Sequence, residues 1–147
     1  MRAGAIFTFT IICAIIAWMD IQKQKIYNEA VAVLFVPAIV SFFVFPEIPI
    51  ASRFLGAVSV SSIMLLVSVI SPGTFGGGDI KMMVPIGLFL GVKRTIVAGI
   101  IALFAGAVWC LMNRFRHKRF AFGPALGLGS VTALLWGEHI WQWIIEF

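Results

Sequence analysis

Charged side chains are scarce in this sequence. They account for 12% of the 147 residues, whereas hydrophobic side chains account for 61%. A water-soluble domain has about 25% charged and about 45–50% apolar residues, so this chain has too few polar side chains to cover a surface in water. The composition excludes a water-soluble globular domain and predicts an integral membrane protein. The length fits one membrane-embedded domain over residues 1–147.

Metal-binding side chains are also few, with two cysteines and two histidines. Cys13 and Cys110 lie inside apolar runs, and neither belongs to a C-x-x-C pair of the kind that holds zinc. His117 and His139 are predicted on opposite sides of the membrane. We expect no metal site, and nothing in the sequence calls for another cofactor.

Long apolar runs are what the sequence does contain. Crossing a bilayer takes about 20 apolar residues, and five runs come close to this length, at 3–19, 30–45, 54–70, 95–112 and 120–137. A sixth run, 82–92, has only 11 residues and lies between Lys81 and Lys93. We predict an all-α membrane protein of about six transmembrane helices, the fourth short and shielded by its neighbours. Five spans with one re-entrant segment is the alternative.

Lysine and arginine orient these helices, because cytoplasmic loops carry an excess of both. With the N-terminus outside, the inner loops hold seven and the outer side four of the 11 basic residues. The inner residues are Lys23, Lys25, Lys81, Arg114, Arg116, Lys118 and Arg119, the outer ones are Arg2, Arg53, Lys93 and Arg94, and Trp136, Trp141 and Trp143 form an outer aromatic belt. The net charge of +5 then reflects topology and contact with lipid head groups, and we expect no nucleic acid partner.

The only two aspartates, Asp20 and Asp79, fall at helix ends. The first helix runs inward and the fourth starts inside, so both aspartates are predicted at the cytoplasmic face although 59 residues separate them. Two carboxylates close together in a half-buried site share one proton. The ionised one activates a water molecule, and the protonated one donates to a scissile carbonyl oxygen. The alternative for either residue alone is a structural role at a helix end.

Three glycines, Gly76 to Gly78, precede Asp79 and allow backbone or an extended substrate to approach it closely. Together with Trp18-Met-Asp20 and Ile26-Tyr-Asn28, the segment Gly76-Gly-Gly-Asp-Ile-Lys81 resembles the type IV prepilin peptidases, aspartyl proteases with a G-x-G-D motif. Phe120-Ala-Phe-Gly-Pro-Ala-Leu-Gly127 is similar to the Phe-Gly-Pro stretch that opens the last helix of that family. The resemblance runs from about residue 18 to residue 129.

The resemblance implies that Asp20 and Asp79 form the catalytic dyad and that Gly76 and Gly78 shape the active-site loop. It implies a multi-pass enzyme of the plasma (inner) membrane that serves a type IV pilus or protein secretion. The substrate would be a prepilin-like protein, cut on the cytoplasmic side between a short basic leader and an apolar helix. The oligomeric state and the particular pilin stay open.

Several positions are less determined. Lys81 either reaches the inner interface with its charge or lowers the pKa of one aspartate, and Asn28 either caps the second helix or orients the substrate. Gly123 and Gly127, spaced as G-x-x-x-G, favour close helix packing. Tyr27 stands where the family commonly has proline. The chain lacks the paired Cys-x-x-Cys motifs of bifunctional members, so we expect cleavage without methylation.

Two other readings compete with this one. Presenilin-like and signal-peptide-peptidase-like proteases also use G-x-G-D, and Pro124-Ala-Leu126 matches their Pro-Ala-Leu motif, but their first acid follows tyrosine inside a helix, whereas Met19 precedes Asp20. A small proton or cation transporter would also place acids in a membrane. It is disfavoured because no series of acidic residues crosses the predicted bundle.

Overall fold

The computed structural model describes residues 1–72, 74–112 and 122–146. These residues contain six α-helices and no strand: α1 (Arg2–Lys23), α2 (Asn28–Val44), α3 (Ile50–Ile70), α4 (Gly77–Leu90), α5 (Val92–Met112) and α6 (Gly123–Glu146). The prediction of an all-α chain with six helices is confirmed. The basic segment 114–119 and the first two residues of the Phe-Gly-Pro stretch lie outside the described residues.

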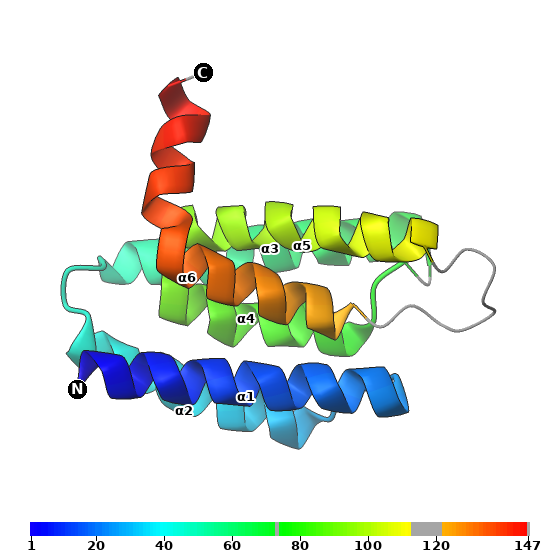
Figure 1. The fold of residues 1–147 in the computed structure, drawn as a ribbon, viewed down its shortest axis with the longest axis horizontal. Coiled ribbons are helices and arrows are strands. Elements are labelled where there is room, and N and C mark those ends of the chain that lie inside the picture. The colour runs from blue at the N-terminus through cyan, green and yellow to red at the C-terminus, as the bar shows by residue number, and fades with distance from the viewer. Residues whose placement is uncertain (73, 113–121, 147) are drawn as a thin grey trace.

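The helices run alternately in opposite directions along one bundle (Figure 1). The pair α1 and α2 forms one side, α3 and α5 form the other, and α4 lies with α6 between them. The short helix α4 contacts α2, α3, α5 and α6. Its buried residues are Asp79, Met82, Met83, Pro85, Ile86, Gly87, Phe89 and Leu90. The prediction that the fourth helix is short and shielded by its neighbours is confirmed.

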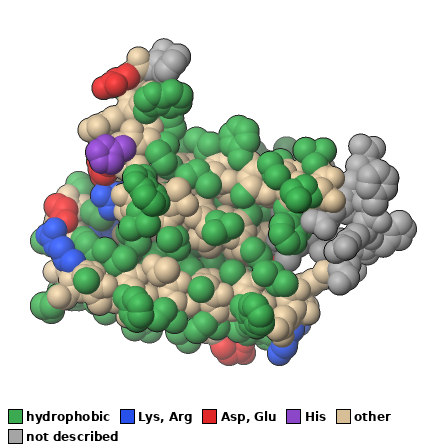
Figure 2. Space-filling view, viewed as in Figure 1, with side chains coloured by type: hydrophobic (Ala, Val, Ile, Leu, Met, Phe, Trp, Pro, Cys, Tyr) green, Lys and Arg blue, Asp and Glu red, His purple; other side chains and the backbone are tan. Residues whose placement is uncertain are grey.

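Hydrophobic side chains also cover the outside of the bundle (Figure 2). Phe7, Phe43 and Phe104 are each more than 60% exposed, at 67%, 83% and 71%. Among the described residues, α1, α3 and the Val92–Trp109 part of α5 are long and apolar enough to cross a membrane, and α2 is a shorter apolar helix. An apolar exterior of this extent is stable in lipid and not in water, which supports a membrane protein.

The junction between α4 and α5 is a single residue, Gly91, whose φ of 75° is open to glycine but not to most side chains. Its N–H donates to the Gly87 carbonyl at 2.9 Å. Val92 N–H donates to Ser52 Oγ at 3.1 Å, which fixes the joint against α3. The helix predicted over residues 95–112 begins three residues earlier, at Val92, so Lys93 and Arg94 belong to the first turn of α5. The last helix also continues past the predicted end at residue 137 as far as Glu146.

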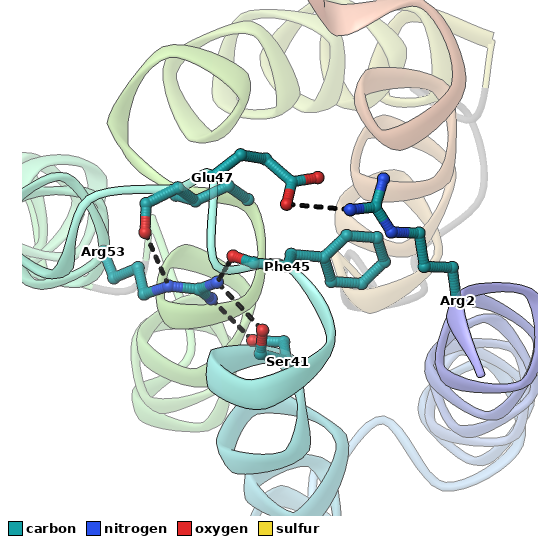
Figure 3. A network of polar contacts seen from close by, with 6 residues as sticks. Arg2, Ser41, Phe45, Glu47 and Arg53 are labelled. Carbon is teal, nitrogen blue, oxygen red and sulfur yellow. Dashed lines mark hydrogen bonds and ion pairs between the residues drawn. The ribbon is translucent and has the colours of Figure 1, made fainter.

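Arg53, which was predicted on the outer side, is buried, with 1% exposure. Its guanidinium lies where the carbonyl ends of α2 and α4 meet the first turn of α3 (Figure 3). It donates to Ser41 Oγ at 2.6 Å, and to the carbonyls of Ser41, Phe45 and Leu88 at 2.9, 2.8 and 2.9 Å. Carbonyls at a helix C-terminus carry partial negative charge, so they favour a buried cation here, and the nearby charge of Glu47 adds to this effect.

We expect Arg53→Gln to lower the free energy of unfolding by on the order of 3 kcal/mol, because several buried acceptors would lose their donor. The matched control is Arg2→Gln, whose guanidinium forms an exposed ion pair with Glu47 at 3.0 Å. Exposed ion pairs contribute about 0–1 kcal/mol, so this control should unfold like the parent. Unfolding in detergent, followed by circular dichroism, measures both. Equal stability of the two variants would contradict the role given to Arg53.

Candidate active site

Asp20 and Asp79 lie at the same end of the bundle, Asp20 in the last turn of α1 and Asp79 in the first turn of α4. Both are buried, with 5% and 7% exposure. They line one cavity of about 960 Å³ together with Asn28, Lys81 and the glycine segment before Asp79. The negative charge of Asp20 contributes to the pKa shift of Asp79, so the two carboxyl groups interact electrostatically.

Asp20 occupies an unfavourable place on its own helix. The last turn carries the negative end of the helix dipole, which repels a carboxylate. The compensation comes from α6, whose first residue, Gly123, donates its backbone N–H to Asp20 Oδ2 at 2.8 Å. A helix N-terminus is a favourable position for an anion. Through this bond α6 stabilises the charge that α1 alone would not.

Asp79 is the third residue of α4, and its Oδ2 accepts the backbone N–H of Gly76 at 3.1 Å. Its Oδ1 is buried and, within the described ranges, accepts no hydrogen bond. Asp79 precedes the apolar part of α4 and opens into the cavity. Burial and, to a smaller extent, the charge of Asp20 together raise the pKa of this carboxyl to about 6, although the bond from Gly76 lowers it. A carboxyl with this pKa is ionised for the most part at pH 7 and holds its proton readily at slightly acidic pH.

The glycines before Asp79 have different surroundings. A Cβ at Gly76 would lie 2.9 Å from Asp79 Oδ2, and a Cβ at Gly78 would lie 2.7 Å from Ile26 Cβ. A Cβ at Gly77 would meet nothing within 4 Å. Gly76 and Gly78 therefore allow two close approaches, one to the carboxylate and one to the segment after α1. These are the two glycines of the G-x-G-D pattern.

Lys81 and Asn28 contact one another at the cavity, where Lys81 Nζ donates to Asn28 Oδ1 at 3.2 Å. Neither aspartate forms an ion pair with a described lysine or arginine. Tyr27 has φ −80° and ψ 143°, a backbone conformation that proline also adopts. Its ring contacts Lys23 and Lys25, whose Nζ atoms lie 5.3 and 5.8 Å from its centroid. The turn after α1 thus has the backbone conformation that proline would give it, although Tyr27 stands at this position.

Gly123 is the site residue that sequence reasoning missed. A Cβ there would lie 2.7 Å from Asp20 Oδ2, whereas a Cβ at Gly127 would lie 3.6 Å from the Cys13 carbonyl. Gly127 thus packs α6 on α1, as predicted, but Gly123 contacts the carboxylate. The signal was the Phe-Gly-Pro stretch, which places a glycine N–H at the start of a helix. In the part of the chain that the structure describes, no three or more histidine, cysteine or acidic side chains are grouped to hold a metal ion.

An apolar groove of about 300 Å³ adjoins this cavity. It lies between α2 and α4 and is lined by Val31, Ala32, Phe35 and Val84. Asn28 and Lys81 line both the groove and the cavity. The cavity beside the aspartates therefore continues into the apolar groove between α2 and α4.

The fold and the site define a class: all-helical membrane proteins with a buried pair of aspartates in a cavity at one end of the bundle. Residues 7–111 match the sequence model of the type IV leader peptidase family, and the chain belongs to this family.

Curated relatives agree with this assignment. The chain is 29% identical over 144 residues to a prepilin leader peptidase/N-methyltransferase of Bacillus subtilis. This alignment covers 94% of the chain and 58% of that protein. It is 31% identical over 101 residues to a protein of the same name from Neisseria gonorrhoeae, an alignment that covers 65% of this chain and 35% of that protein. It is 30% identical over 76 residues to one from Aeromonas salmonicida, an alignment that covers 48% of this chain and 26% of that protein. The chain thus spans between about a quarter and three fifths of these relatives. No solved structure matches it.

The interaction between the carboxyl groups predicts how Asp79 titrates. Because the chain has two aspartates, ¹³C labelling of the aspartate carboxyl carbons gives one signal for each. In detergent we expect the Asp79 signal to titrate at about pH 6. Asp20→Asn removes a negative charge that disfavours ionisation, so the pKa of Asp79 should fall and yet stay above its usual value because burial remains. A pKa of Asp79 that does not respond to Asp20→Asn would contradict the interaction.

Proposed function

We propose that this chain is an aspartyl endopeptidase that removes the short basic leader of prepilin-like proteins at the cytoplasmic membrane face. The observation that carries the proposal is the buried carboxylate pair, each member bonded to backbone N–H at the start of a helix and both open to one cavity. Membership of the type IV leader peptidase family supports the substrate class.

The two carboxyl groups have different roles in this proposal. Asp20, which accepts the N–H of Gly123, is the ionised base, and Asp79, with a raised pKa, holds the shared proton. Asp20 removes a proton from water as the water oxygen bonds to the scissile carbonyl carbon, and Asp79 donates its proton to the carbonyl oxygen. The tetrahedral intermediate then collapses: Asp79 takes back a proton from one of its two hydroxyl groups, the C–N bond breaks, and the proton held by Asp20 passes to the leaving nitrogen.

The cavity and the groove divide the substrate between them. The cut segment would lie in the cavity with its backbone extended along the glycine segment 76–78, where Gly77 has open space beside it. The apolar helix of the substrate would lie along the groove between α2 and α4, because both surfaces are apolar and the groove starts at the cavity. Lys81 and Asn28 would stand at the boundary between leader and helix, close to the bond that is cut.

We expect Asp20→Asn and Asp79→Asn each to reduce cleavage of a prepilin by at least a factor of about 1,000, since each removes one partner of a proton-transfer pair that acts as a unit. The assay uses purified protein in lipid and detects the product by mass spectrometry. Glu47→Gln, an exposed acid that pairs with Arg2, is the control and should cleave like the parent.

The product also separates the competing readings. A cut between the basic leader and the apolar helix supports a leader peptidase, whereas a cut inside the apolar helix would indicate an intramembrane protease of the presenilin type. Proton flux through the reconstituted protein with no cleavage would replace the proposal by a transporter. Cleavage at the wild-type rate by either aspartate variant would contradict the proposed catalytic dyad.

Gly123 should act through Asp20. In Gly123→Ala the new methyl group would lie 2.7 Å from Asp20 Oδ2 and must displace it, so we expect cleavage to fall by about 100-fold or more. In Gly127→Ala the nearest atom lies at 3.6 Å, an ordinary contact, and cleavage should stay within about threefold. Both glycines lie in α6, so the pair controls for effects on the helix. Equal activity of the two variants would contradict the positioning role of Gly123.

A further inference from the structure

Helix α6 is longer than the part of it that packs into the bundle. Its buried residues run from Gly123 to Gly137, and none follows in residues 138–146, which we call the tail segment. The tail segment stays helical but turns away from the bundle and runs across the direction of the other helices (Figure 1). It lies at the end of the bundle that holds the N-terminus and the end of α4, opposite to the end of α1 and the start of α4, which carry the aspartates.

Polar and apolar side chains separate to two faces of this segment. With 3.6 residues per turn, the spacing i, i+1, i+4, i+8 places four residues on one face. These polar residues are Glu138, His139, Gln142 and Glu146, and Ile145 lies at the edge of the same side. The other side carries Ile140, Trp143 and Ile144, and it continues to Trp136 just before the segment. His139 lies at the boundary between the two sides, since it lines one hollow with Trp136, Ile140 and Trp143. In Figure 2 the acidic and histidine side chains lie on the edge turned away from the bundle, and hydrophobic side chains lie on the other edge.

Contacts with α5 hold the start of the tail segment. Arg94, in the first turn of α5, pairs with Glu138 across 3.3 Å, and its side chain is 26% exposed. A Cβ at Gly137 would lie 3.0 Å from Arg94 Cγ, so the arginine fits because glycine has no side chain. Ile140 and Trp141 still touch the hydrophobic core. The departure of the segment from the bundle is therefore fixed by packing and charge.

We propose that the tail segment is an interfacial helix, which lies in the plane of the membrane with its aromatic face in the boundary between head groups and acyl chains. Three independent features support this orientation. Its direction crosses α1, α3 and α5, the helices able to span a membrane. Its two faces have the separation that interfacial helices show. Tryptophan, whose ring is apolar and whose N–H is polar, favours this depth, and Trp136 and Trp143 are 56% and 66% exposed.

The chemistry of the polar face defines the lipid preference. Interfacial helices that need anionic lipid carry lysine and arginine on that face. Here the polar face holds two carboxylates, a histidine and an amide, and the described tail has no basic residue apart from that histidine. Burial of apolar area therefore drives the contact, and zwitterionic phosphatidylcholine should suffice as the partner.

Depth-dependent quenching tests the proposal in the full chain. Two single-tryptophan variants keep only Trp136 or only Trp143, with phenylalanine at the other four tryptophans, and are reconstituted in phosphatidylcholine brominated at defined carbons. Seven residues separate the two rings, a rise of about 10 Å along a helix. An interfacial helix places both rings at the same shallow depth, whereas a helix that continues straight separates them by about 10 Å. A variant that keeps Trp18, 65% exposed on α1, confirms that brominated lipid quenches an exposed ring.

The other outcomes overturn the proposal. A depth difference near 10 Å would make the tail segment part of a membrane span. Absence of quenching for both rings, with Trp18 quenched, would mean that a second copy or water covers the aromatic face. Quenching that needs phosphatidylglycerol would contradict the lipid preference.

A second measurement is available if the tryptophan variants fold poorly. Gln142→Cys and Ile144→Cys change exposed positions on the two faces, in a background with Cys110→Ser. A spin label at 142 should be relaxed by a water-soluble nickel complex and one at 144 by oxygen, which concentrates in lipid. Equal accessibility of the two labels would exclude an interfacial orientation.

Discussion

The bond from Gly123 N–H to Asp20 is the contact on which the aspartate end of the bundle depends. It joins the last helix to the first, and it places the positive end of one helix dipole against a carboxylate at the negative end of another. Only a glycine allows the close approach. The same bond fixes where Asp20 lies in the cavity it shares with Asp79. The hydrogen bond that joins α6 to α1 therefore also positions a carboxylate of the site.

Helix α4 is held by charge at both of its ends. At its first turn, Asp79 accepts a backbone N–H from Gly76, and at its last turn the Leu88 carbonyl accepts a hydrogen bond from the buried Arg53. Each interaction matches the sign of the helix dipole, with an anion at the start and a cation at the end. With 14 residues at about 1.5 Å each, α4 is about 21 Å long, which is less than the thickness of the hydrocarbon core of a bilayer. Its neighbours cover its sides, and the two charged groups satisfy its ends.

The helices and the meeting of the two aspartates could be predicted because both follow from strong patterns. Apolar runs define the helices, and alternation of direction brings the end of α1 and the start of α4 to one side. The burial of Arg53 could not be predicted, because it depends on the tertiary packing that brings the ends of α2 and α4 to the start of α3. The length of α6 was underestimated because Glu138 and His139 end the apolar run while the helical period continues. The contact of Gly123 with Asp20 depends on tertiary packing that no spacing encodes.

The Gly91 joint couples the positions of three helices. Because one residue connects α4 to α5, the end of α4 cannot shift along the bundle unless the start of α5 shifts with it. The same joint is bonded to Ser52 of α3 through the N–H of Val92. The short helix that carries Asp79 is thus anchored at its far end to two helices long enough to cross a membrane.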